Sequence, residues 1–169
     1  STVGKVGIVY DETIPTLPTV DISSNNSNGA TFAKVGDIIT LAITGSENIQ
    51  TPTVTIAGNA ATITSGSNGE SVYSATYTMQ SSDNTGTVAF TVDFSDMANN
   101  DGTQVTAVAN DADGGVTFDK QAPSFTAVTI ASNNSNDATL AVVNDVITVN
   151  LTSDEAIKTG ADPTVTVNS

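Results

Sequence analysis

The sequence predicts an all-β protein built from Greek-key β-sandwich repeats in tandem. Three observations carry this prediction: a composition rich in Thr and Asn, short segments of alternating apolar residues, and an internal repeat of about 108 residues. β-Branched residues favour the pleated surface of a sheet, whereas Asn, Gly and Asp favour the turns between strands. No stretch of about 10–12 residues has the apolar spacing of an amphipathic helix.

The internal repeat relates residues 11–50 to residues 119–158. Aligned without a gap, the two stretches share 19 of 40 residues, including the run SNNSN, and the motif TVT recurs after a three-residue insertion. A unit of about 108 residues has the size of one small β-sandwich. The chain is then expected to be a segment of a tandem array of repeats. Its expected parts are 1–10, the last strand of a preceding repeat; 11–118, a complete repeat; and 119–169, the first half of the following repeat.

Alternating apolar residues and turn signals mark the first strands of the complete repeat. Val20 and Ile22 begin a strand behind two prolines. The run at 39–43 alternates Ile, Leu and Ile, and a further strand covers 54–56. The pair Gly58-Asn59 predicts a turn, after which residues 61–64 form a short strand.

The later strands follow the same logic. Residues 73–79 alternate Tyr, Ala, Tyr and Met, and the run VAFTVDF at 88–94 has the cleanest period of two in the chain. A last strand is expected in two pieces, 105–108 and 116–118, interrupted by 110–115. Seven short strands at this spacing favour a two-sheet Greek-key sandwich.

Composition excludes several classes of function. The chain has four Lys and no Arg, His, Cys or Trp. It therefore lacks the groups for Cys nucleophiles, His general bases, zinc sites and arginine clamps, and we expect no enzyme. A net charge of −14 argues against nucleic acid and anionic lipid as partners. No apolar run approaches the roughly 18–20 residues of a membrane span.

Several phrases in order along the chain resemble bacterial immunoglobulin-like repeats. They are SNNSNGATFAKVGDIITL, SENIQTPTVTIAG, YSATYTM, GTVAFTVDFSDMANNDGTQVT and VTFDKQAP. Such repeats occur in tens of copies in giant secreted surface proteins, notably adhesins of Gram-negative and marine bacteria. The resemblance implies immunoglobulin-like sandwiches in tandem that serve as stalk or spacer units at the bacterial cell surface. Each repeat would have its neighbours in the chain as partners, and Ca²⁺ would rigidify the junctions.

Acidic residues are expected to gather at one pole of the sandwich. Threading the strands through a sandwich places three loops at the pole where the chain enters, and Ca²⁺ takes six to eight oxygen ligands that loops can supply. The candidate calcium ligands there are Asp11 in the linker, Glu47 in the loop after residues 39–43, and Asp96, Asn99 and Asp101 in the loop after 88–94. Asp119 and Glu155 repeat two of these positions. The alternative is that these acids are solvated loop residues that serve solubility and turns.

A second acidic cluster lies at 110–115, with the sequence NDADGG. Alternating Asp followed by Gly resembles part of an EF-hand loop, but the Glu at position 12 and the flanking helices are missing. A bulged loop and a metal site are the two interpretations of this cluster.

The half repeat and the function leave further alternatives. Residues 119–169 leave Ile130, Ile147, Val149 and Leu151 without a facing sheet, so this half is expected to be disordered, dimerised or completed by a neighbour. A subunit of a self-assembling surface layer or filament is the alternative to a spacer. A carbohydrate-binding module would need exposed aromatic residues on one sheet face, and aromatics make up 5% of the chain.

Overall fold

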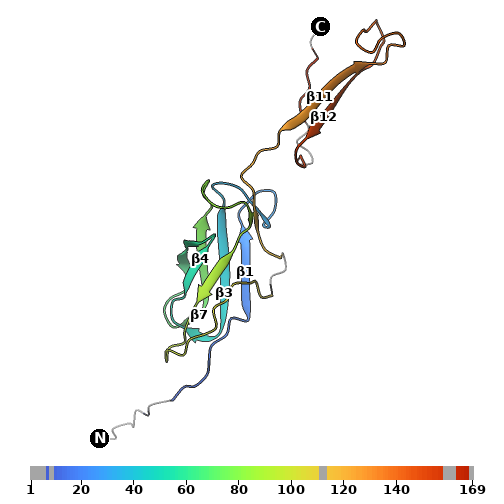
Figure 1. The fold of residues 1–169 in the computed structure, drawn as a ribbon. Coiled ribbons are helices and arrows are strands. Elements are labelled where there is room, and N and C mark those ends of the chain that lie inside the picture. The colour runs from blue at the N-terminus through green and yellow to red at the C-terminus, as the bar shows by residue number, and fades with distance from the viewer. Residues whose placement is uncertain (1–6, 8–9, 111–113, 158–162, 168–169) are drawn as a thin grey trace. The chain divides into compact units, whose positions relative to one another are not determined.

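The computed structural model describes residues 7, 10–110, 114–157 and 163–167. The described chain is all-β and divides into two compact units, Ser1–Lys120 (unit 1) and Gln121–Ser169 (unit 2), whose strands are labelled in Figure 1. Asp119 and Lys120 thus belong to unit 1, although the repeat predicts a boundary before them. The strand expected in residues 1–10 lies almost entirely outside the described residues. Among the described residues, no helix is long and apolar enough to cross a membrane.

The first layer of unit 1 is a four-stranded antiparallel sheet in the order β1-β3-β7-β6. Its strands are β1 (Thr19–Ser24), β3 (Ile38–Ile49), β6 (Thr62–Ser65) and β7 (Glu70–Thr78). β3 lies between β1 and β7 and buries Ile39, Leu41 and Ile43 completely. Because successive side chains of a strand point to opposite faces, this alternation directs one apolar row into the core.

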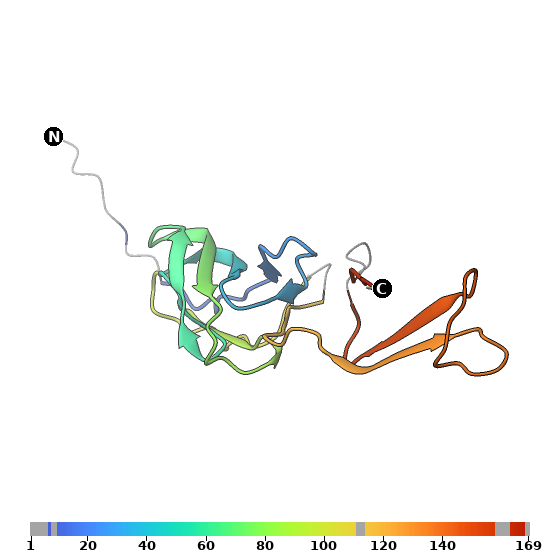
Figure 2. The ribbon, with the colours of Figure 1, turned by 90° about the horizontal axis from the view of Figure 1, so that it is seen from above.

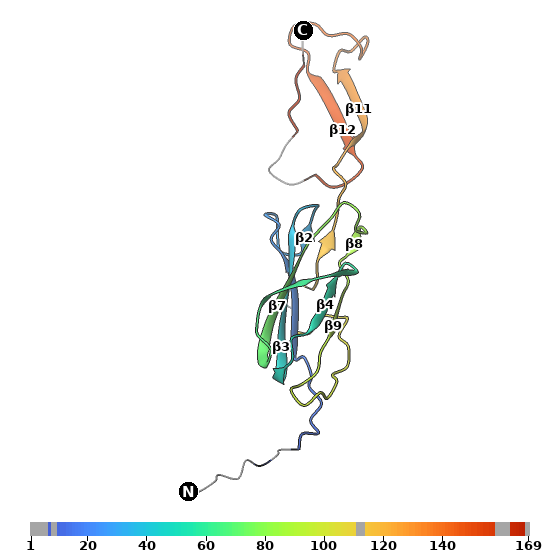
Figure 3. The ribbon, with the colours of Figure 1, turned by 90° about the vertical axis from the view of Figure 1, so that its left-hand side faces the viewer.

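The second layer consists of two short sheets, seen opposite β3 and β7 in Figure 3. One has the order β5-β4-β9 and the other β2-β10-β8. The strands are β2 (Phe32–Ala33), β4 (Thr53–Ile56), β5 (Asn59–Ala60), β8 (Gly86–Thr87), β9 (Phe90–Asp93) and β10 (Thr117–Phe118). One buried cluster joins residues of both layers, including Leu41 and Tyr73 on one side and Val92 and Phe118 on the other. Unit 1 is therefore consistent with a β-sandwich.

Tyr73 shows how the core accommodates a polar atom. The residue is 1% exposed, and the carbonyl oxygens of Ile49 and Ser67, at 2.9 and 2.7 Å from its hydroxyl oxygen, share the single donor hydrogen of that hydroxyl. Gly66 has a positive φ of 97°, and a Cβ there would lie 2.4 Å from the Tyr73 ring. The turn before β7 therefore requires glycine, both for its conformation and for the space beside the ring.

Two of the predicted strands are divided because the chain changes partners within them. Residues 88–94 are not one strand: Val88 donates to the carbonyl of Val116, whereas Phe90 pairs with Ile56 of β4. Residues 105–108 do not form a strand. Val105 bridges Val92 of β9, but Ala109 exchanges hydrogen bonds with Val20 of β1, so the chain crosses from one layer to the other in between.

Two smaller features of unit 1 also differ from the prediction. The turn after β4 is centred on Ala57 and Gly58, both with positive φ, because Ile56 pairs with Asn59. The short strand expected at 61–64 is confirmed as β6, which pairs with β7 in the first layer. The two-residue strand β2 was not predicted and pairs in parallel with β10.

The described residues of unit 2 contain one antiparallel hairpin, β11 (Phe125–Ser132) and β12 (Ile147–Ser153). In Figure 2 the two strands, orange and red, form a single layer. Their register repeats that of β1 and β3 at an offset of 108 residues: Ser24 pairs with Ile39, and Ser132 pairs with Ile147. Residues 163–167, which include the predicted counterpart of β4, are described but form no strand.

The connection within each hairpin also has the same hydrogen bonds. Asn25 Oδ1 accepts from Ile38 N at 2.8 Å, and Asn133 Oδ1 accepts from Val146 N at 2.9 Å. The carboxylates of Asp37 and Asp145 accept from the backbone three residues earlier, at 2.9 and 2.8 Å. Gly36 and Asn144, at equivalent places, both have positive φ, which Gly adopts without strain and Asn tolerates better than most residues.

Candidate metal centre

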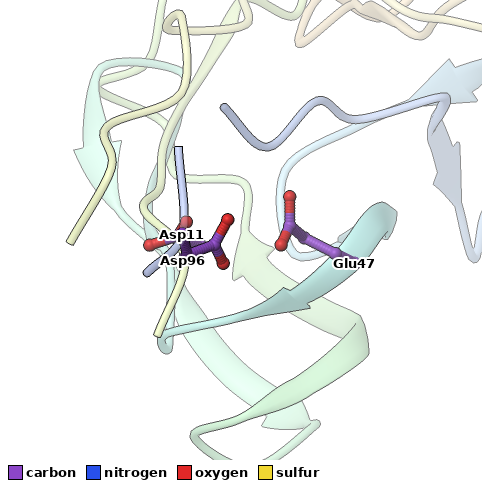
Figure 4. A group of neighbouring side chains, drawn as sticks. All are labelled: Asp11, Glu47 and Asp96. Carbon is purple, nitrogen blue, oxygen red and sulfur yellow. The ribbon is translucent and has the colours of Figure 1, made fainter. Parts of the chain in front are cut away.

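Three carboxylates from separate segments of unit 1 meet where the chain enters it. Asp11 lies in the incoming linker, Glu47 near the end of β3, and Asp96 just after β9. One carboxylate oxygen from each lies within 4.8 Å of the others. Figure 4 shows the three side chains directed toward a common region.

The course of β3 places Glu47 beside Asp96. β3 pairs with β7 up to Thr44, shifts register, and pairs again at Ile49. Glu47 therefore lies within β3, in the irregular part of the strand, and not in the loop after it as the sequence predicts. Ile49 also bridges Asp96, and the next residue, Gln50, donates its backbone N–H to Ser95 at 2.8 Å. The end of β3 and the chain after β9 are thus joined backbone to backbone next to the carboxylates.

Asp96 is held by the loop that follows it. The residue is 1% exposed, and its Oδ1 accepts from Ala98 N and Asn100 N, each at 2.8 Å. Its Oδ2 accepts from Asn100 Nδ2 at 2.7 Å. Desolvation alone would raise the pKa of this carboxyl, but the hydrogen bonds from Asn100, Ala98 and Asn99 outweigh it and lower the pKa. Asp96 is therefore an ionised, fixed carboxylate at neutral pH.

The surroundings of Glu47 disfavour the ionised form of its carboxyl, in contrast to those of Asp96. Its Oε1 is buried and has no hydrogen-bond partner. Desolvation, followed by repulsion from Asp11 and Asp96, raises the pKa of the Glu47 carboxyl. A buried acceptor without a donor, beside two further carboxylates, is an unfavourable arrangement that a cation would relieve.

This donor set fits Ca²⁺. Calcium is a hard cation that binds carboxylate, amide and carbonyl oxygens and tolerates irregular geometry. Asp11, Glu47 and Asp96 supply only oxygens, and the unpartnered Glu47 Oε1 offers a lone pair that no protein group uses. The set contains no nitrogen or sulfur ligand, so it does not resemble a zinc site.

The other two candidate ligands of this pole have other partners. Asn99 Oδ1 accepts from Gln50 Nε2 at 2.8 Å. Asp101 bridges Ser95 through the backbone and lines a separate polar pocket of about 430 Å³ with Asp93 and Gln50.

The candidate ligands Asp119 and Glu155 fall in different units of the chain. Asp119 belongs to unit 1, where its backbone N–H donates to Ala33, and Glu155 belongs to unit 2. Residues 111–113 of the second acidic cluster lie outside the described residues.

Asn100 also belongs to the candidate site, although the sequence patterns do not single it out. Its Nδ2 donates both to Asp96 Oδ2 and, at 3.3 Å, to the backbone oxygen of Asp11. It thereby joins the incoming linker to the loop after β9. The only signal in the sequence is its position four residues after Asp96, where a loop can fold back onto the carboxylate.

Comparisons with known proteins give no family for this chain. No protein-family model, no curated protein and no solved structure matches it.

Proposed function

We infer that this chain is a segment of a long extracellular bacterial surface protein, in which immunoglobulin-like Greek-key sandwiches in tandem act as structural spacers. Ca²⁺ held by Asp11, Glu47 and Asp96 would fasten each incoming linker to its sandwich. The role is mechanical, and no catalytic activity is expected from a chain without His, Cys or Arg.

The repeated hydrogen bonding is the observation that carries this proposal. The hairpins β1–β3 and β11–β12 share register, turn bonds and a positive φ at the same place, 108 residues apart. Sequence identity in 19 of 40 aligned residues supports a common origin of the two stretches. A chain that repeats one domain type in series suits a spacer, because domains joined end to end add length.

The carboxylate group supports the calcium part of the proposal. Asp11 is the last residue before the Glu12–Pro15 part of the linker, whereas Glu47 and Asp96 belong to the body of the sandwich. A bound cation would neutralise their repulsion and tie the linker to the domain. In the described part of the chain, the Asn100 Nδ2 hydrogen bond to the Asp11 oxygen joins the start of the linker to the loop after β9. Further along the linker, Thr16 and Ser46 of β3 exchange hydrogen bonds at 3.0 and 2.8 Å.

Thermal unfolding of the full chain with Ca²⁺ and with chelator, at fixed ionic strength, tests this proposal. A ligand that binds only the folded state stabilises it, and calcium at about 100 times its Kd should raise the Tm of unit 1 on the order of 10 °C. Glu47→Gln should abolish the shift, whereas Glu12→Gln, an exposed linker residue with the same change in charge, should retain it. An unchanged Tm in the parent chain would remove the metal site from the proposal.

A self-assembling surface layer or filament is the second candidate function. It is favoured by the apolar residues that unit 2 exposes, among them Val128 at 61% and Ile130 at 63%. Contiguous exposed apolar surface commonly marks a contact with another protein. Sedimentation of the full chain distinguishes the two: a spacer stays monomeric, whereas a filament subunit associates as concentration rises. A carbohydrate-binding module has no such support, because the exposed aromatics Tyr10, Phe32 and Phe125 lie on separate segments.

A further inference from the structure

We propose that Asn28 is a site of spontaneous covalent modification, in which its side-chain amide cyclises onto the backbone nitrogen of Gly29 and water opens the ring to aspartate or isoaspartate. The tripeptide Ser-Asn-Gly stands at 27–29 and again at 67–69, and these are the Asn-Gly pairs of the sequence. The structure leaves the first pair free to react and restrains the second. The inference concerns a turn of unit 1 and does not depend on the calcium site.

The reaction needs a backbone nitrogen that can reach the Asn side chain. The Gly29 nitrogen attacks Cγ of Asn28, the Cγ–Nδ2 bond breaks, and the side-chain nitrogen leaves as ammonia with the proton from Gly29. Water then adds to either carbonyl of the succinimide ring and cleaves a ring C–N bond, which leaves aspartate or isoaspartate. Glycine favours the first step because it has no Cβ to obstruct its nitrogen and adopts unusual backbone angles without strain.

Asn28 lies in an exposed turn between β1 and β2. Its side chain is exposed, and in the described part of the chain no hydrogen bond holds it. Gly29 N donates to Asn26 O at 3.2 Å, a bond within the turn and outside the strand ladders. Exposed loops open locally at a low cost in free energy. The Gly29 nitrogen can therefore leave this bond and approach the Asn28 side chain while the sheets stay intact.

Asn68 has the same two neighbours in sequence but is held on both sides. Its Oδ1 accepts from Thr51 N at 3.1 Å, which fixes the side-chain amide. The nitrogen that would attack it, Gly69 N, donates to Ile49 O at 3.0 Å, beside the pairing of Ile49 with Glu70. Cyclisation at Asn68 therefore requires the end of β3 to separate from the start of β7. Opening a strand pair costs more free energy than opening an exposed turn.

Unit 2 provides the complementary comparison. Asn136 occupies the place of Asn28 at an offset of 108 residues, and it is exposed as well. Asn28 N and Asn136 N both donate to the Asn side chain two residues earlier, at 2.8 and 3.0 Å. The residue after Asn136 is Asp137, whose Cβ hinders attack by its backbone nitrogen. Asn68 thus keeps the tripeptide and changes the structure, whereas Asn136 keeps the turn and changes the following residue.

The modification changes the loop between β1 and β2 in two ways. Either product places a new carboxylate in a turn that was uncharged at this position. Isoaspartate also inserts one methylene into the main chain, within the loop that Ser24 N closes by donating to Ala30 O at 2.9 Å. The change accumulates with time at this one turn of unit 1.

The test incubates the full chain at mildly alkaline pH and follows each site by peptide mapping with mass spectrometry, which detects the replacement of –NH2 by –OH. In the folded chain Asn28 should convert at least about tenfold faster than Asn68 or Asn136, which corresponds to about 1.4 kcal/mol in activation free energy. In guanidinium chloride, where the hydrogen bonds that hold Asn68 are lost, Asn28 and Asn68 should convert at similar rates while Asn136 stays slower. Asp137→Gly gives unit 2 the residue that unit 1 has, and should raise the rate at Asn136 toward that of Asn28.

Three outcomes would overturn the proposal. The first is an equal rate at Asn28 and Asn68 in the folded chain, which would mean that the structure does not select the site. The second is an Asn28 that persists in the folded chain under conditions in which the denatured chain converts. The third is an unchanged rate at Asn136 in the Asp137→Gly chain, because the turn would then not support the reaction.

Discussion

Ile22 and Ile130 occupy the same place in two hairpins with the same register, yet one is 1% exposed and the other 63%. The difference separates the properties that residues within a hairpin determine from the burial that only the rest of the domain can provide. Register, turn and positive φ are the same in both units because residues within the hairpin determine them. Burial differs because the covering strands come from residues 53–118 in unit 1.

The largest expected effect tests burial directly. Ile22→Ala should lower the free energy of unfolding of unit 1 by about 2–5 kcal/mol, since it removes a buried side chain and leaves a cavity. Ile130→Ala should cost unit 2 less than about 0.5 kcal/mol, as for other exposed positions. Denaturant unfolding measures the first and hydrogen exchange across β11–β12 the second. Equal losses would mean that unit 2 has a covered face in solution.

An effect of intermediate size tests whether each hairpin forms its own turn. Asn25→Ala and Asn133→Ala each remove the acceptor for one backbone N–H at the closed end of a hairpin. Each should destabilise its own hairpin by about 0.5–1.5 kcal/mol, the net value of one hydrogen bond. Site-resolved hydrogen exchange measures both losses in the same way. If Asn25→Ala reduced the stability of its hairpin and Asn133→Ala did not, the turn of unit 2 would not be formed independently.

A smaller effect concerns the carboxylate group, which unit 2 does not reproduce among its described residues. In chelator, Glu47→Gln should raise the Tm of unit 1 slightly, because it removes the charge that burial and two neighbouring carboxylates disfavour. Differential scanning calorimetry measures the shift, with Glu12→Gln as the control that leaves the Tm unchanged. A lower Tm for Glu47→Gln in chelator would contradict the unfavourable arrangement described above.

The smallest effect is the pH dependence of unit 1 in chelator. The folded-state pKa of Asp96 lies below its ordinary value of 3.8, so its stabilisation is present above pH 3.8 and is lost as the pH falls through the lower pKa. The folded-state pKa of Glu47 lies above 4.5, so its contribution is present below pH 4.5 and is lost as the pH rises through the raised pKa. Denaturant midpoints should therefore rise slightly from neutral pH toward 4.5 and fall below 3.8. A Glu47→Gln variant should lack the Glu47 contribution to the rise and keep the fall.

Sequence patterns predict the strands whose side chains alternate regularly against one partner layer. β3 and β7 follow this rule, and their apolar rows identify both the strands and the core face. The pattern fails where the chain changes partners, as between Val88 and Phe90, because residues remain apolar while their hydrogen bonds move to another strand. β2 has only two residues, too few for any period to be visible.

The sequence predicts the chemistry of the candidate site better than it predicts which residues form it. Asp11, Glu47 and Asp96 were expected to meet because their segments reach the same pole. Asn99 and Asp101 lie in the same loop as Asp96, but sequence proximity does not determine which side chains of a loop converge. The loop turns so that Asn100 bonds Asp96, while Asn99 bonds Gln50.

The parallel pair β2–β10 has a consequence for a chain under tension. A load applied at the C-terminal end of unit 1 enters through β10. Thr117 in this strand and Asp119 just after it donate their backbone N–H groups to the carbonyls of Thr31 and Ala33, each at 2.8 Å. Just beyond, the Lys120 ammonium donates to the carbonyls of Ser81 and Asp83 at 3.1 and 2.8 Å. Backbone bonds that lie across the direction of pull are sheared together instead of being opened one after another. Forced unfolding is governed by the unfolding rate, so this short pair would matter more to mechanical lifetime than its two residues suggest.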